Sequence, residues 1–113
     1  MNVRVHPEIQ IDRNGNSAAI NAQVISLLRL VAETGSIPDA CDMAGLDLLP
    51  AWNMLAQTED ALGFPLFQYI QHKSRLTENA RKLMDDYDQF EAAVQANADR
   101  LFGSFPFHEA LMS

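Results

Sequence analysis

Three glycines divide the centre of the chain into short segments that can each form a helix. Gly35, Gly45 and Gly63 follow stretches with apolar residues at helical spacing. Glycine readily takes the left-handed conformation that ends many helices, so each glycine can terminate the helix before it. The spacing predicts two short helices joined by a tight turn, over residues 37–44 and 47–62.

Polar residues before each helix supply the matching start signals. Ser36 can cap the first helix, and Asp39 three residues later can complete a capping box. Asp47 can cap the second helix, where Pro50 falls in the first turn and costs no helical hydrogen bond. Two helices joined by a short turn containing glycine form a helix-turn-helix, whose second helix commonly enters the DNA major groove. Ser36 and the backbone amides after it are then a candidate phosphate contact.

Landmarks around this motif match those of known DNA-binding families. They are GSI at 35–37, DACDMAGL at 39–46, AW at 51–52, LGFPLF at 62–67 and RLT at 75–77. The chain resembles the winged helix-turn-helix of the LysR-type regulators and, more closely, the amino-terminal domain of the ModE-type molybdate-responsive regulators. The resemblance covers residues 4–102. It implies a mainly α, α+β fold with an amino-terminal edge strand, a β-hairpin wing and a long carboxy-terminal dimerisation helix.

The length of the chain favours a single domain without a separate sensor. Residues 1–77 would form the DNA-binding unit, residues 78–102 the dimerisation helix of the same compact unit, and residues 103–113 a tail. The molybdate-binding part of ModE-type proteins has no counterpart, and we expect no cofactor. The only cysteine, Cys41, is expected to be buried, and the three histidines lack the spacing of metal ligands.

The composition indicates a folded protein of the cytoplasm. Apolar residues make up 48% of the chain and charged residues 20%. No apolar run approaches the length of about 18 residues that a membrane span needs. The sequence also has no Gly-rich phosphate loop and no nucleophile motif, so we expect no enzymatic activity.

Helical spacing divides residues 47–62 into two faces. The inward positions are Ala51, Leu55, Thr58 and Leu62. The expected outward positions are Leu48, Leu49, Asn53, Gln57 and Asp60. Asn53 and Gln57 lie one turn apart, and their amides can read adenine edges, while Leu48 and Leu49 can contact thymine methyls or a protein partner. Trp52 matches a landmark of the ModE-type pattern and is expected to pack at least partly in the core.

Residues 64–71 and 74–76 are typical of a β-hairpin with its tip near His72, Lys73 and Ser74. As a wing, this hairpin would place its basic residues beside the minor groove. Lys73 and Arg75 are the best candidates in the sequence for contacts to phosphate, with His72 beside them.

The net charge of −7 opposes binding to a polyanion. Affinity for nucleic acids comes largely from Lys and Arg side chains that displace counterions from phosphate. Residues 21–62 contain one basic residue, Arg29, and six acidic ones, whereas residues 63–77 contain Lys73 and Arg75 and no acidic residue. Only the wing is therefore net basic, and the helix-turn-helix is acidic.

The segments before the helix-turn-helix are predicted to form a strand and a helix. Residues 4–11 alternate as in a strand, which Pro7 places at an edge, and residues 12–17 form a turn cluster. The strand would add an edge to the wing hairpin, as in the ModE-type pattern. A first helix over residues 21–34 is predicted by the apolar spacing of Ile20, Val24, Leu27, Leu28 and Val31.

Thr77 can cap a long last helix over residues 78–102. Its seam residues alternate three and four apart, as in a heptad repeat: Ala80, Leu83, Tyr87, Phe90, Val94, Asn97 and Leu101. The seam favours a homodimer through paired helices, with Asn97 fixing the register and two reading helices facing a palindromic site. The alternative is that the seam packs within its own subunit.

Two functions are consistent with these patterns. The first is a dimeric transcription regulator that binds double-stranded DNA. The alternative is an acidic interaction module on the same fold, in which Leu48, Leu49 and the helix-turn-helix bind a protein partner, or in which the last helix forms mixed dimers. A continuous basic strip running from Arg4 or Arg13 across the wings would favour the first.

Overall fold

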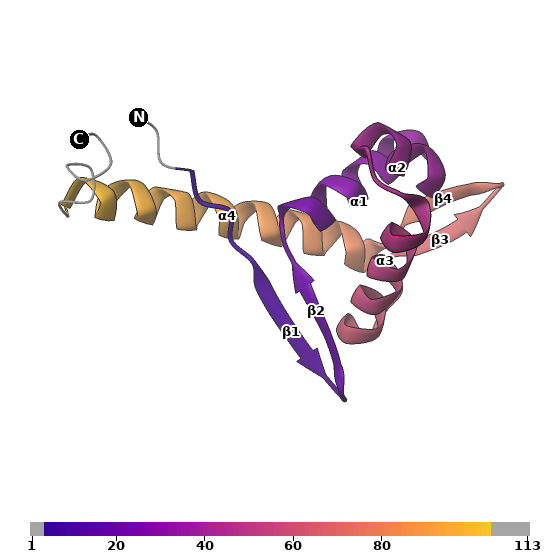
Figure 1. The fold of residues 1–113 in the computed structure, drawn as a ribbon, viewed down its shortest axis with the longest axis horizontal. Coiled ribbons are helices and arrows are strands. Elements are labelled where there is room, and N and C mark those ends of the chain that lie inside the picture. The colour runs from indigo at the N-terminus through magenta and orange to yellow at the C-terminus, as the bar shows by residue number, and fades with distance from the viewer. Residues whose placement is uncertain (1–3, 105–113) are drawn as a thin grey trace.

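The computed structural model describes residues 4–104, which form four helices and two antiparallel hairpins (Figure 1). The elements follow in the order β1 Ile9–Arg13, β2 Asn16–Ile20, α1 Ala22–Thr34, α2 Ile37–Ala44, α3 Leu48–Leu62, β3 Phe67–Ile70, β4 Lys73–Leu76 and α4 Glu78–Ser104. The predicted mainly α, α+β class is confirmed. The expected tail starts inside α4, and its residues 105–113 lie outside the described part of the chain.

The molecule is elongated, with dimensions of 54 × 32 × 23 Å. In Figure 1, α4 runs along the long axis, and α1, α2 and α3 gather around its first turns. The two hairpins project from this helical cluster in different directions. The far half of α4 therefore extends beyond the helical cluster.

The glycine positions end the helices as the sequence predicts. Gly35, Gly45 and Gly63 have φ angles of 70°, 69° and 80°, and α2 has the predicted bounds. The Ser36 side chain accepts a hydrogen bond from the Asp39 amide at 3.2 Å, which confirms the predicted cap. The return bond of the predicted capping box is not formed, because the Ser36 amide donates to Thr34 Oγ1 instead of to the Asp39 carboxylate. Local backbone preferences therefore suffice to predict these boundaries.

The expected side-chain cap at Asp47 is wrong, because Asp47 makes no capping hydrogen bond. An amino-terminal cap usually accepts from the second or third amide of the helix. Pro50 occupies the third helical position and has no amide hydrogen. The proline that suits the first turn thus removes one of the two donors that Asp47 would bind.

The core forms around α1, whose buried residues are Val24, Ile25, Leu27, Leu28 and Val31. Residues from α2, α3, the β3–β4 hairpin and α4 pack against them. Ile20 is also buried, but it ends β2 and does not belong to the first helix. Cys41 is buried as predicted, and burial together with the nearby Asp42 carboxylate raises the pKa of its thiol.

The amino-terminal strand differs from the prediction in position and in partner. The strand starts at Ile9, and β1 pairs with β2 to form a sheet separate from β3–β4. It therefore does not add an edge to the second hairpin. Asn14 and Gly15 have φ angles of 50° and 82°, the geometry that favours a tight two-residue hairpin turn. Because the turn takes only two residues, most of residues 12–17, which were predicted as a loop, belong to the paired strands.

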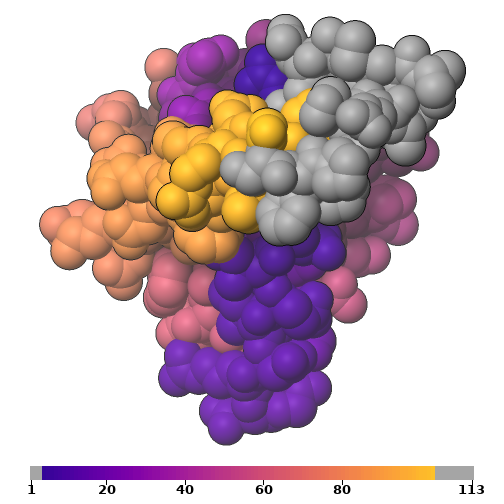
Figure 2. Space-filling view, turned by 90° about the vertical axis from the view of Figure 1, so that its left-hand side faces the viewer, coloured from indigo at the N-terminus to yellow at the C-terminus, as the bar shows by residue number. Residues whose placement is uncertain are grey.

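The β1–β2 hairpin packs against α3. Figure 2, viewed along α4, shows this hairpin projecting from below the helix. Residues before β1 lie instead along α4, where the Val5 amide donates to Gln95 at 2.8 Å and the Tyr87 hydroxyl donates to the Pro7 carbonyl at 2.7 Å. The predicted strand over residues 4–11 thus has two parts with different partners.

Thr77 begins α4 as predicted. Its side-chain oxygen accepts from the Ala80 amide at 3.2 Å, and its hydroxyl donates to the Pro65 carbonyl at 2.8 Å. The helix continues to Ser104, two residues beyond the predicted end.

The predicted dimer seam on α4 is partly used within the subunit. Ala80 and Tyr87 belong to the core, and Leu83 packs against it. Burial is the main cause that raises the pKa of the Tyr87 hydroxyl, and the nearby carboxylates of Glu91, Asp88 and Glu8 raise it further. Tyr87 is thus buried and Leu83 half-buried within the subunit, where contacts to the core and the amino-terminal segment satisfy the heptad spacing. A dimer contact by these two residues stays a prediction.

The carboxyl end of α3 is held by the first hairpin. Arg13 Nη1 donates to the Leu62 carbonyl at 2.8 Å, so a cation binds the negative end of the helix dipole. A Cβ atom at Gly63 would collide with the Arg13 guanidinium, whereas a Cβ at Gly45 would meet nothing within 4 Å. Gly63 therefore has two roles, in backbone conformation and in leaving space for Arg13.

We expect Gly63→Ala to lower the free energy of unfolding by about 2 kcal/mol, and Gly45→Ala by about 1 kcal/mol. Both substitutions force alanine into a left-handed conformation, but only the first displaces Arg13. Urea denaturation of both variants and of Arg13→Ala measures the difference. Equal losses for the two glycine variants would show that the Arg13 contact contributes nothing to stability.

Candidate nucleic-acid interface

One face of α3 is exposed along its length. Its members recur at helical spacing: Leu48, Leu49, Trp52, Asn53, Ala56, Gln57 and Asp60. The five positions predicted to face outward are all exposed. Of the positions predicted to face inward, Ala51, Leu55 and Thr58 are buried, and Leu62 is half-buried. Asn53 and Gln57 thus present their amides to solvent from one face of the helix.

Trp52 does not pack in the core as expected. Its side chain is 52% exposed and lies at the side of the α3 face that borders the β3–β4 hairpin. The neighbouring Ala51 occupies the buried position instead. Adjacent positions on a helix are rotated by about 100°, which leaves the indole at the edge of the buried face.

The β3–β4 hairpin turns at Gln71 and His72, one residue earlier than the predicted tip. Both residues have positive φ angles, of 51° and 63°, and Ile70 pairs with Lys73 across the turn. The His72 ring contacts the ring of Tyr69 edge-on. The hairpin is fixed to the helices by a hydrogen bond of 2.9 Å from the Ser74 amide to the Gly35 carbonyl.

Basic side chains gather along β4 and the first turn of α4. Lys73, Arg75 and Arg81 border a hollow of about 190 Å³ between the end of α1, β4 and the start of α4. Glu33 is the one acidic residue on its border. The stem of Lys73 lies beside Gly35, the residue between α1 and α2. The sequence had indicated Lys73 and Arg75, but Arg81 joins them only through the fold.

The amino terminus of α2 has little capacity left for a phosphate. The Ser36 oxygen accepts from Asp39, and the Ser36 amide donates to Thr34 Oγ1 at 3.2 Å. Pro38 has no amide hydrogen. Of the groups proposed for this contact, the Ile37 amide and the Ser36 hydroxyl hydrogen remain, and Asp39 places negative charge beside them.

The remaining arginines near the helix-turn-helix are engaged elsewhere. Arg13 binds the end of α3, and Arg29 forms an ion pair with Asp88 on α4. Residues 37–62 contain no basic side chain. Within residues 4–104, the cations near α3 without such a partner lie on the β3–β4 hairpin and in the first turns of α4.

Metal-ligand clusters and membrane-spanning helices are absent from the described residues. No group of three or more potential metal ligands lies together within residues 4–104. No helix in this range has an apolar stretch long enough to cross a bilayer. Neither a protein-family model nor a curated protein matches the chain. The assignment of function therefore depends on the chain's own geometry.

Proposed function

We propose that the protein is a dimeric DNA-binding transcription regulator with a ModE- or LysR-like winged helix-turn-helix. In this proposal α3 enters the major groove and the β3–β4 hairpin acts as the wing. The supporting observations are two exposed amides on α3, Asn53 and Gln57, and a neighbouring hairpin that carries the local positive charge.

The two surfaces would contribute differently to binding. Amide side chains can make paired hydrogen bonds to adenine in the major groove, which confers sequence preference. Lys73, Arg75 and Arg81 would neutralise backbone phosphates, which adds affinity for any sequence. His72 at the turn would lie nearest the minor groove. Exposed Leu48 and Leu49 would contact thymine methyl groups.

Dimerisation would use the part of α4 that the subunit core leaves uncovered. Phe90 and Leu101 are exposed, as is Asn97, and Val94 is half-buried. They continue the seam beyond Tyr87, where α4 extends past the helical cluster. Two copies paired along this segment would present two reading helices to a palindromic site.

A titration against a random pool of duplex DNA at two salt concentrations, followed by sequencing of the retained fraction, tests this function. We expect salt-sensitive enrichment of a palindrome. The Lys73→Ala/Arg75→Ala double variant should bind all sequences about 10–100-fold more weakly and reduce the salt slope by about two. Lys82→Ala removes a neighbouring exposed cation outside the cluster and should have a smaller effect. Unchanged affinity of the double variant would show that the hairpin does not contact the DNA.

An interaction module is the alternative, and a specific surface favours it. Met43, Leu48, Leu49 and Trp52 are exposed apolar residues on α2 and α3. Residues 37–62 carry five acidic residues and no basic one. Such a surface fits a protein partner better than phosphate. Failure of the protein to retain any DNA at low salt would support this alternative.

A further inference from the structure

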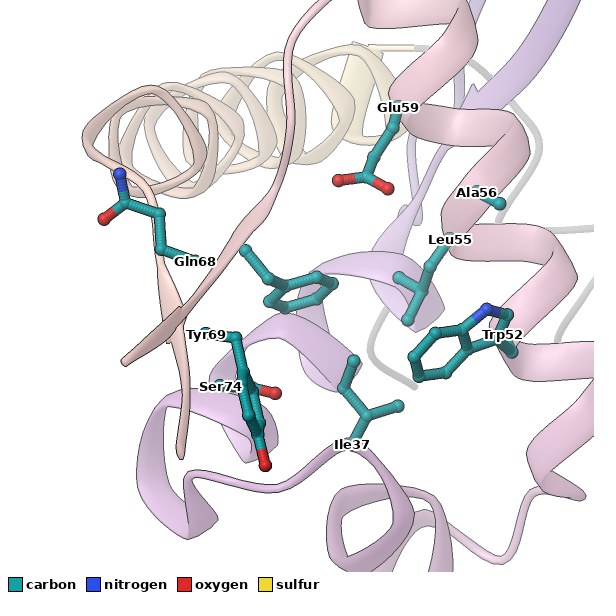
Figure 3. Close-up of a pocket in the computed structure, with 9 residues that line it drawn as sticks. Ile37, Trp52, Leu55, Ala56, Glu59, Gln68, Tyr69 and Ser74 are labelled. Atoms are coloured by element: carbon teal, nitrogen blue, oxygen red, sulfur yellow. The ribbon is translucent and has the colours of Figure 1, made fainter. Parts of the chain in front are cut away.

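A hollow of about 300 Å³ lies between α3 and the β3–β4 hairpin. Figure 3 shows side chains from both elements directed toward it, with Trp52 and Tyr69 on opposite sides. Its floor is apolar and includes Ile37, Leu55 and Phe67. The volume is at the lower end of the range for small-molecule sites, which is about 300–1,000 Å³.

The two aromatic rings at the hollow are unusually accessible. Trp52 is 52% exposed and Tyr69 is 74% exposed, although large aromatic side chains normally bury most of their surface. Both rings thus leave surface open to solvent, and the His72 ring contacts Tyr69 edge-on. Aromatic faces attract cations by their quadrupole, and tryptophan does so most strongly.

The only ionisable acid or base that lines the hollow, apart from the Tyr69 phenol, is a carboxylate. Glu59 projects from α3 toward the space between helix and hairpin (Figure 3). Its Oε2 accepts a hydrogen bond of 2.7 Å from the Leu66 amide, which fixes the side chain in this direction. Within the described residues no hydrogen bond is made to Oε1. The hollow therefore combines a positioned negative charge with two open aromatic faces.

This combination selects the chemistry of a ligand. An anion such as phosphate would be repelled by Glu59, and a purely apolar ligand would leave the carboxylate without a partner. A compact cation with an apolar or aromatic body satisfies the charge, the rings and the floor together. We propose that the hollow is a binding site for a small organic cation of the amine or quaternary ammonium class. This proposal does not depend on DNA binding.

The single tryptophan of the chain makes the site directly observable. Trp52 lines the hollow, so its fluorescence reports occupancy without a label. Benzyltrimethylammonium is a suitable probe because it joins an aromatic ring to a quaternary ammonium group. Phenylacetate is the matched probe of opposite charge. Both are titrated at constant ionic strength.

We expect a saturable change in fluorescence with benzyltrimethylammonium, at about tenfold or greater affinity than with phenylacetate. Glu59→Gln keeps an oxygen for the Leu66 amide but removes the charge, and should weaken binding of the cation about tenfold. Tyr69→Leu should weaken it about fivefold. Asp60→Asn removes the same charge from the next position on α3, outside the hollow, and should leave the affinity unchanged.

Three results would overturn the proposal. One is the absence of saturation with the cation. Another is an equal affinity of the wild type and the Glu59→Gln variant. The third is an equal loss in the Glu59 and Asp60 variants, which would indicate attraction by the general negative charge of the protein. Circular dichroism of each variant establishes that the fold is retained before the titrations are compared.

Discussion

Leu66→Ala is expected to lower the free energy of unfolding by about 3 kcal/mol. Leu66 is 0% exposed and belongs to the core cluster. Its backbone is held on both sides, since its amide donates to Glu59 and its carbonyl accepts from the Thr77 amide at 3.0 Å. The chain cannot move inward to fill the space that the leucine leaves. A cavity therefore adds to the loss of transfer free energy.

Denaturation by urea at a fixed protein concentration measures this effect. Leu49→Ala is the matched control, because Leu49 is 70% exposed on α3 and its truncation should change stability by less than about 0.5 kcal/mol. A small domain has a total stability of about 5–15 kcal/mol, so the loss at Leu66 would be a large fraction of it. Similar losses in the two variants would contradict the described core.

Phe90→Asp is expected to convert the proposed dimer into monomers, with a loss of dimer affinity of about 100-fold or more. Phe90 is 44% exposed and follows Tyr87 on the seam, beyond the core of the subunit. In a symmetric pair of α4 helices, the substitution would bury two unpaired carboxylates near the two-fold axis. Sedimentation equilibrium over a range of protein concentrations measures the association constant.

The control for this variant is Gln89→Asp. It adds the same charge at an exposed position on α4 outside the seam, and should leave the association constant nearly unchanged. Loss of the dimer only in the Phe90 variant would support pairing along α4. A persistent dimer would place the subunit contact on another surface. DNA affinity measured on the same samples would then show whether two reading helices are needed.

Local signals in the sequence predicted the helical part of the fold closely. Gly35 and Gly45 bracket α2, and Ser36 and Thr77 cap helices as expected. These features depend on backbone conformation and on hydrogen bonds within a few residues, so they can be inferred from a short stretch of chain. The alternation of buried and exposed positions on α3 followed from helical periodicity for the same reason.

Tertiary contacts decided the features that several partners could satisfy. The strand at residues 4–11 had two potential partners, and the tight turn at Asn14 and Gly15 paired β1 with β2 instead of the second hairpin. The α4 seam could pack within its own subunit or against a second copy. Tyr87 is buried in the core of its own subunit, where it contacts Pro7. Apolar periodicity specifies which face is covered but does not specify what covers it.

The candidate site also combines features that the sequence predicted with features that only the fold decided. The sequence by itself placed Asn53 and Gln57 on one exposed helical face, because a spacing of four residues fixes their relative direction. Only the folded chain brought Arg81 to Lys73 and Arg75, and left Trp52 and Tyr69 open around Glu59. These groups lie on different elements, so their proximity depends on how the hairpin packs against the helices, which no local pattern encodes.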